Sequence, residues 1–107
     1  MKKEWMALVA ASLLLPGVVQ AGTAADMQPL ADKNGCFACH GMQMKLVGPG
    51  FAEVAARYKG DSEAAERLGK KIREGGKGVW GPVPMPAHGN LGEADARKLA
   101  EWVLSVG

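Results

Sequence analysis

Five consecutive residues, Cys36-Phe37-Ala38-Cys39-His40, constrain this chain of 107 residues more than any other feature. The pattern C-x-x-C-H is the attachment signature of a c-type haem. Each cysteine thiol can add to one haem vinyl group to form a thioether, and the histidine that follows can bind the iron from the proximal side. The stretch therefore predicts one covalently bound haem c, attached through Cys36 and Cys39, with His40 as an iron ligand.

Three other interpretations fit the same residues less well. A thioredoxin-like thiol pair also has the pattern C-x-x-C, but it belongs beside a βαβ unit, and the sequence has no such pattern. A structural zinc site needs four ligands, whereas outside these five residues the chain offers only His88 and no cysteine. Two cysteines this close in sequence also form a structural disulfide poorly. Haem attachment is therefore the interpretation we favour.

The first 21 residues have the features of a secretory signal peptide. Two lysines are followed by an apolar run, and Val19-Gln20-Ala21 matches a small-x-small cleavage site. The apolar run is shorter than the ~20 residues that a membrane-spanning helix needs, so cleavage is favoured over a retained anchor. We expect residues 1–21 to be removed, residues 22–107 to form the mature domain, and this domain to lie in the periplasm without stable membrane insertion.

The charge and size of the mature chain restrict its function further. Removing the leader takes away two lysines and one glutamate, so the net charge falls from +2 to +1 over 86 residues. Charges of both signs alternate and form no basic stripe, which excludes a nucleic-acid binder. A chain of this size makes one domain with a marginal core. A haem at its centre would add the apolar surface that such a core lacks.

Apolar residues recur at spacings of three and four, which is the period of amphipathic helices. We expect helices over residues 26–34, from 51 to 58, between the break at Gly60-Asp61-Ser62 and Gly75, and from about 93 to 106. The expected inner faces are Phe51, Val54, Ala55 and Tyr58 in the second helix, Ala65, Leu68 and Ile72 in the third, and Ala96, Leu99, Ala100 and Val103 in the fourth.

The stretch from residue 75 to residue 92 is rich in glycine and proline. Prolines at this density do not suit a helix or a central strand. Long irregular loops in compact domains are usually functional or disordered, and prolines beside apolar residues favour a functional, rigid loop. Since no alternating strand pattern is visible, the predicted fold class is all-α, with four to five short helices wrapped around one covalently bound haem.

The ligand in the sixth position of the iron decides the function. Met85 lies between Pro84 and Pro86, which restrict the backbone and can hold the thioether in one place. A thioether suits the low-spin iron of an electron carrier and raises the potential relative to a nitrogen ligand. His88 is the main competitor, although an exposed loop position is its ordinary state. An open sixth position would instead indicate a gas sensor or a small peroxidase, and a thiol–disulfide enzyme is the third alternative.

Over essentially all of residues 22–107 the sequence resembles the small class I bacterial cytochromes c of the cytochrome c-551 type, also called cytochrome c8. The nine residues 78–86, GVWGPVPMP, are the most specific part of this resemblance. The other segments that carry it are the haem pentad at 36–40, KLVGP at 45–49 and LAEWVLS at 99–105.

This resemblance implies the class I cytochrome c fold and an electron carrier, not an enzyme, with His40 and Met85 as the two axial iron ligands. It implies that the carbonyl of Pro49 accepts a hydrogen bond from the His40 ring, which would fix the ring and make it a better donor to the metal. Trp80 would donate its indole N–H to a buried haem propionate, and Lys71 would be a basic partner of that group.

The resemblance also implies redox partners in respiration, with a membrane cytochrome complex as electron donor and a nitrite reductase or terminal oxidase as acceptor. The protein is expected to be a monomer. Two positions depart from the family. A large aromatic residue is often found where this chain has Ala31, and Phe37 could compensate for it. An asparagine that touches the ligand sulfur is often found where this chain has His88, and Asn90 could take that role if the alignment gap falls earlier.

Overall fold

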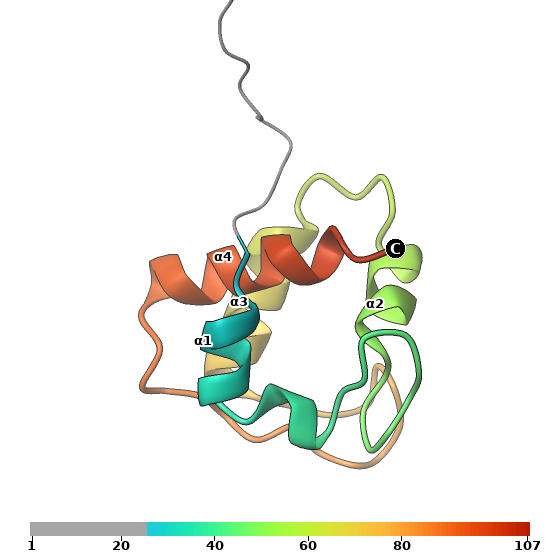
Figure 1. Ribbon diagram of the computed structural model, residues 1–107, viewed down its shortest axis with the longest axis horizontal. Coiled ribbons are helices and arrows are strands. Elements are labelled where there is room, and N and C mark those ends of the chain that lie inside the picture. The colour runs from blue at the N-terminus through green and yellow to red at the C-terminus, as the bar shows by residue number, and fades with distance from the viewer. Residues whose placement is uncertain (1–25) are drawn as a thin grey trace, which may run out of the picture.

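The computed structural model describes residues 26–107, which form four α-helices and one turn of 3-10 helix (Figure 1). No strand occurs in these residues, so the predicted all-α class is confirmed. None of the helices in this part of the chain is long and apolar enough to cross a membrane. The expected signal peptide lies outside the described residues. The elements are α1 (Gln28–Lys33), η1 (Cys36–Ala38), α2 (Phe51–Arg57), α3 (Ala64–Glu74) and α4 (Glu93–Leu104).

The first helix is shorter than its pattern predicted, because the residues at both ends make turns. Pro29 stands in its first turn, where the missing N–H is not needed. Asp26 lies before the helix, and its Oδ1 accepts a hydrogen bond from the backbone N–H of Gln28 at 3.0 Å. After the helix, Gly35 adopts a left-handed conformation with φ of 73°. This turn directs the chain straight into η1.

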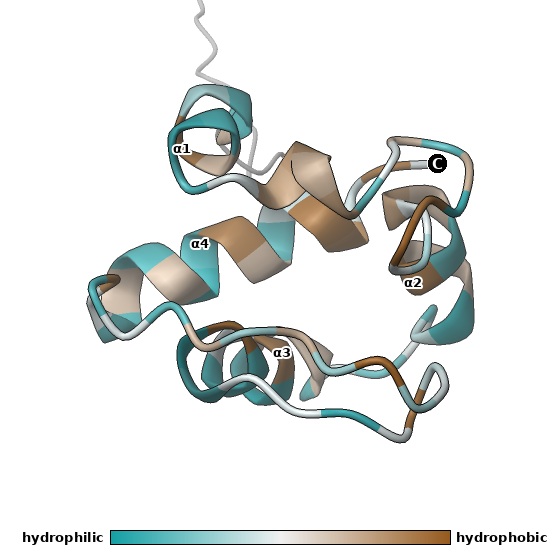
Figure 2. Cartoon of the chain, turned by 90° about the horizontal axis from the view of Figure 1, so that it is seen from below, coloured by the Kyte–Doolittle hydropathy of each residue, from teal (hydrophilic) through white to brown (hydrophobic). Residues whose placement is uncertain are grey.

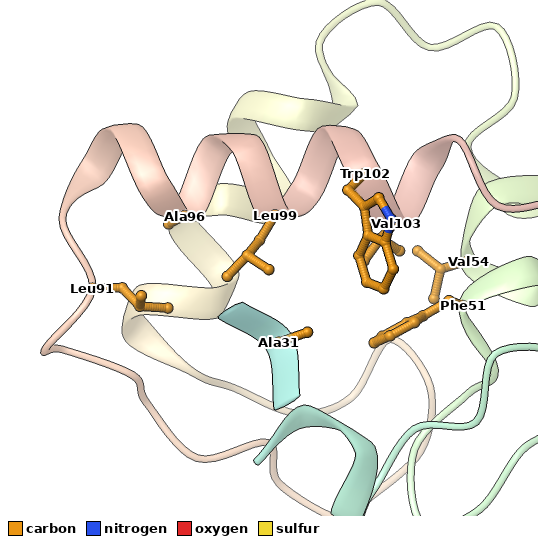
Figure 3. Close-up of a cluster of buried hydrophobic side chains, with 8 residues drawn as sticks. All are labelled: Ala31, Phe51, Val54, Leu91, Ala96, Leu99, Trp102 and Val103. Carbon is orange, nitrogen blue, oxygen red and sulfur yellow. The ribbon is translucent and has the colours of Figure 1, made fainter. Parts of the chain in front are cut away.

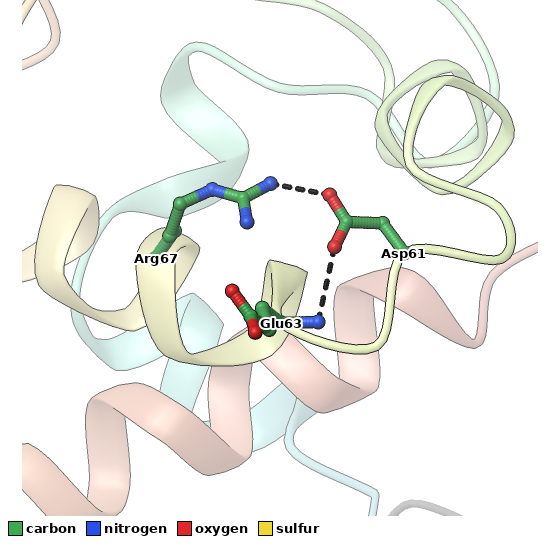
Figure 4. A network of polar contacts seen from close by, with 3 residues as sticks. All are labelled: Asp61, Glu63 and Arg67. Carbon is green, nitrogen blue, oxygen red and sulfur yellow. Dashed lines mark hydrogen bonds and ion pairs between the residues drawn. The ribbon is translucent and has the colours of Figure 1, made fainter.

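The third helix begins at Ala64, after a turn that Asp61 stabilises (Figure 4). One carboxylate oxygen of Asp61 accepts the backbone N–H of Glu63 at 3.0 Å. The other oxygen pairs with the guanidinium of Arg67, one turn into the helix. Asp61 thus satisfies an N–H group that the start of a helix leaves unpaired, although it stands two residues before the N-cap.

The last helix forms the centre of the core (Figure 3). It packs most extensively on α3 and also on α2, and its expected inner face is confirmed, with Trp102 buried as well. In Figure 2 hydrophilic and hydrophobic residues alternate along α4, as one buried face requires. The buried hydrophobic residues are Ala31, Phe51, Val54, Ala64, Leu91, Ala96, Leu99, Ala100, Trp102 and Val103.

The contact between α3 and α4 depends on small residues that the apolar pattern of α3 did not single out. Ala64 and Gly69 are the buried residues of α3. A Cβ atom on Gly69 would lie 3.2 Å from the Cα of Arg97 in α4, so glycine lets the two backbones approach closely. Leu68 and Ile72, which were expected on the inner face, are half-buried at the edge of the core.

An aromatic cluster joins the attachment turn to the core. The ring of Phe37, in η1, lies 5.8 Å from that of Phe51 and 6.4 Å from that of Trp102, both edge to face. Phe51 and Trp102 contact each other at 5.6 Å in the same manner. Edge-to-face pairs add to the stabilisation from buried area. Ala31 in α1 is buried in the core against which Phe37 packs, so compensation of this alanine by Phe37 stays a prediction.

Candidate functional site

One cavity in the described residues brings together the four side chains that the sequence pointed to as haem ligands and anchors, Cys36, Cys39, His40 and Met85. Its empty volume is ≈ 1330 Å³, including the part open to solvent. The walls are mostly apolar. They come from α1, α2, α3 and α4 together with the two loops that follow the pentad and α3.

The short turn η1 explains why both thiols face the same cavity. The carbonyl of Cys36 accepts the backbone N–H of Cys39 at 3.2 Å and that of His40 at 3.0 Å, which closes the turn. Both cysteines are free thiols. Burial raises the pKa of the Cys36 thiol, with a smaller contribution from nearby Cys39 and a backbone hydrogen bond opposing it. The thiolate is the nucleophilic form of cysteine, and a raised pKa disfavours it at Cys36.

The imidazole of His40 is held from three sides. Its Nδ1 lies 2.7 Å from the carbonyl oxygen of Pro49, and when Nδ1 donates this hydrogen bond, Nε2 keeps its lone pair for a metal. The ring stacks on Phe51 with centroids 5.0 Å apart and planes 23° apart. A Cβ atom on Gly48 would lie 2.8 Å from Cε1 of the ring, so position 48 must lack a side chain.

The role of Phe51 beside His40 was not predicted from the sequence, which indicated only that Phe51 faces the core. No periodic pattern could show the stacking, because it depends on the turn through Pro49 and Gly50 that brings α2 under the ring. That turn is stabilised at the start of α2, where the Glu53 carboxylate accepts the backbone N–H of Gly50 at 2.7 Å.

Met85 lies half-buried at the cavity, in the loop after α3. His88 and Asn90, the two residues considered as partners of its sulfur, do not line the cavity. The side chain of Asn90 donates a hydrogen bond to the Oδ1 of Asn34 at 3.1 Å. The Nδ1 of His88 is buried and has no hydrogen-bond partner within residues 26–107.

Trp80 and Lys71 both line the same cavity. Trp80 is 39% exposed, and the guanidinium of Arg57 stacks over its indole, 4.7 Å from the ring centroid. Arg57 also donates a hydrogen bond to the carbonyl of Val79 at 3.3 Å. No sequence pattern indicated this contact, because the partners are 22 and 23 positions apart. The Nζ of Lys71 lies close to the backbone of Gly76, where a Cβ atom would be only 2.8 Å from it.

These residues fit a haem c. Two free thiols, an oriented imidazole and a thioether converge on a large cavity with mostly apolar walls, which is the donor set that covalent attachment and axial ligation need. A bare metal ion fits less well. Within residues 26–107 no group of three or more His, Cys, Asp and Glu side chains could hold one.

Comparison with known proteins agrees with this chemistry. The family model described as Cytochrome c matches residues 24–107. Cytochrome c-552 of Nitrosomonas europaea is 44% identical over 106 residues, which are 99% of either chain. Cytochrome c-551 of Pseudomonas aeruginosa is 42% identical and covers 88% of this chain and 91% of its own length.

Solved structures show the same fold. The crystal structure of wild-type Nitrosomonas europaea cytochrome c552 superposes with a TM-score of 0.70 at 46% identity, over 74% of this chain and 98% of that one. The class 1 cytochrome MtoD from Sideroxydans lithotrophicus ES-1 gives a TM-score of 0.65 at 28% identity, over 74% of this chain and 90% of that one. The class I fold predicted from the sequence is thereby confirmed.

Proposed function

The chain belongs to the cytochrome c family, and we propose that it is a periplasmic carrier of single electrons whose haem iron is held by His40 and Met85. The cofactor is one covalently attached haem c, which supplies the reversible uptake and release of one electron. The observation that carries the proposal is the convergence of Cys36, Cys39, His40 and Met85 on one mostly apolar cavity. Filled axial positions suit an electron carrier and not an enzyme.

Each of these residues has a distinct role. Cys36 and Cys39 tether the cofactor. His40 binds the iron through Nε2, and its hydrogen bond to Pro49 fixes the ring plane and strengthens it as a donor. Met85 fills the remaining position and favours the reduced state. The apolar walls keep water away from the iron, so few solvent molecules have to reorient when the charge of the iron changes.

The polar end of the cofactor needs partners of its own, and we assign this role to Trp80 and Lys71. The indole N–H would donate to a haem propionate, and the ammonium group would offset its charge. The position of both residues at the cavity supports this assignment. Arg57 stacks behind the indole and would restrain its orientation.

The cellular setting follows from the leader and the family. Residues 1–21 are removed on export, and residues 22–107 work in the periplasm as a monomer. The donor is a membrane cytochrome complex, and the acceptor is a nitrite reductase or a terminal oxidase. The leader's charge and apolar pattern support export, and the similarity to cytochromes c-551 and c-552 supports a respiratory role.

Substitution of the proposed sixth ligand tests this function. In the oxidised wild-type holoprotein we expect a methionine–iron charge-transfer band. Met85→Ala should keep the haem attached, abolish the band and lower the potential by on the order of 0.1 V, since axial ligands set potentials over a range of about 0.8 V. The measurements are optical spectra, potentiometry and intact mass.

The control for this test is Met44→Ala, because Met44 is 67% exposed and does not line the cavity. It should retain the wild-type spectrum and potential. A high-spin wild-type spectrum without the band would refute the proposal and favour an open-site haem protein, such as a gas sensor or a small peroxidase. An unchanged Met85→Ala spectrum would point to another ligand, with His88 the first to examine.

A further inference from the structure

We propose that Gly75 is a positioning residue for Met85: it lets the end of α3 lie against the backbone of the methionine loop and so fixes where the thioether stands. The inference rests on the proposed role of Met85 as an iron ligand. It concerns how the chain delivers that ligand, which none of the motifs in the sequence explains.

The backbone of Met85 is tied directly to the end of α3. Its N–H donates to the carbonyl of Gly76 at 2.8 Å, and its own carbonyl accepts the N–H of Gly76 at 3.1 Å. These two hydrogen bonds form an isolated antiparallel bridge. Three residues later, the N–H of His88 donates to the carbonyl of Ile72 at 3.0 Å. Backbone hydrogen bonds therefore hold residues 85–88 against α3 and the two residues that follow it, and α3 packs on α4.

Gly75 is the residue that permits this close approach. It caps α3 with φ of 73°, a conformation in which L-residues with a side chain are strained. A Cβ atom at this position would lie 2.5 Å from the carbonyl oxygen of Met85, 2.9 Å from the N of Ala87 and 3.0 Å from the carbonyl carbon of Pro86. All three atoms belong to the backbone, so they cannot move aside without moving the loop that carries the thioether.

The test compares two glycines that both have a positive φ but have different surroundings. Gly60 has φ of 83°, but a Cβ there would meet nothing within 4 Å. Gly75→Ala and Gly60→Ala should both lower the thermal midpoint of the holoprotein by about 5 °C or more, the cost of the strained φ. Only Gly75→Ala should also weaken the methionine–iron band of the oxidised protein and lower its potential. Equal spectra and potentials in the two variants would overturn the proposal.

A second measurement uses the wild-type holoprotein and does not depend on the variant folding. Imidazole added to the oxidised protein should displace the thioether. If the bridge and the ligand support one another, the backbone amides of Gly76 and Met85 should then exchange with deuterium at least several-fold faster, while the Leu99 amide in α4 stays protected. Unchanged exchange at both amides after displacement would overturn the proposal. A wild-type protein without the band would refute the ligand assignment itself.

Discussion

Exposed apolar side chains in the two loops that help to line the cavity bear on how this protein meets its partners. Val83 is 60% exposed, Leu46 53% and Val47 51%, and Val83 and Val47 also line the cavity. Exposed apolar groups that gather at one place usually mark a contact surface. Since residues 22–107 carry a net charge of only +1, long-range steering should be weak and docking largely apolar.

Lysine substitutions at these exposed residues should therefore impair docking. We expect Val83→Lys or Leu46→Lys to slow electron transfer to a partner by roughly tenfold, equivalent to about 1.4 kcal/mol of docking energy, with a nearly unchanged potential. Gln28→Lys, which adds the same charge at an exposed position of α1, is the control. Stopped-flow kinetics at several salt concentrations would show a shallow salt dependence. A steep salt dependence, together with wild-type electron-transfer rates in both Val83→Lys and Leu46→Lys, would place docking on a charged surface elsewhere.

At the scale of residues, the sequence predicted the side chains with unusual chemistry and missed those that act by shape. The pentad and the proline-flanked Met85 are recognisable because their residue types and spacing are rare. The stacking of Phe51 on His40 and the stacking of Arg57 on Trp80 are contacts between ordinary residue types. They follow from how loops turn in three dimensions, and no local pattern records them.

Among the elements, α3 begins with a turn whose contribution to stability we expect to depend on pH. The hydrogen bond from Arg67 is the main cause that lowers the pKa of Asp61 below its ordinary 3.8, and the backbone N–H of Glu63 acts in the same direction. A carboxylate whose pKa is lower in the folded state stabilises the fold fully above its unfolded pKa. This stabilisation is lost as the pH falls through the folded-state value.

Asp61→Asn should therefore destabilise the holoprotein at pH 7 and lose this effect in acid. The difference in unfolding midpoint between the wild type and the variant should be largest at pH 7 and shrink toward zero as the pH falls below the ordinary pKa of 3.8 and through the lowered folded-state value. Glu101→Gln, which removes an exposed ion pair with Arg97 inside α4, is the control that leaves the start of α3 intact. Denaturant unfolding across this pH range is the measurement. A difference that stays constant down to the most acidic pH would contradict the assignment.

At the scale of elements, periodicity predicted the last three helices, start and stop residues predicted the first, and the buried face of α4 was correct in full. The boundaries were less accurate, because Asp26 and Asp61 hydrogen-bond to the chain from outside the helices and do not begin them. The buried face of α3 was displaced toward Ala64 and Gly69. A glycine in a helix carries no hydrophobic signal, although here it sets the distance between two helices.

The molecule as a whole is built around its cavity. The helices have 6, 7, 11 and 12 residues, and isolated helices shorter than about 12–15 residues are marginal in water. Figure 1 shows the loop after α3 crossing the molecule opposite α4, so the two long loops close the site that the helices leave open. This arrangement could be predicted only through the resemblance to a family, because irregular loops have no periodic pattern.

A potentiometric titration of the matured wild-type protein, followed by its optical spectrum, tests the central claim most directly. Iron held by His40 and Met85 at a single covalent haem predicts one reversible one-electron transition, with the methionine–iron band present in every oxidised spectrum and absent from every reduced one. A high-spin oxidised form, or a transition that is irreversible or involves two electrons, would contradict the account.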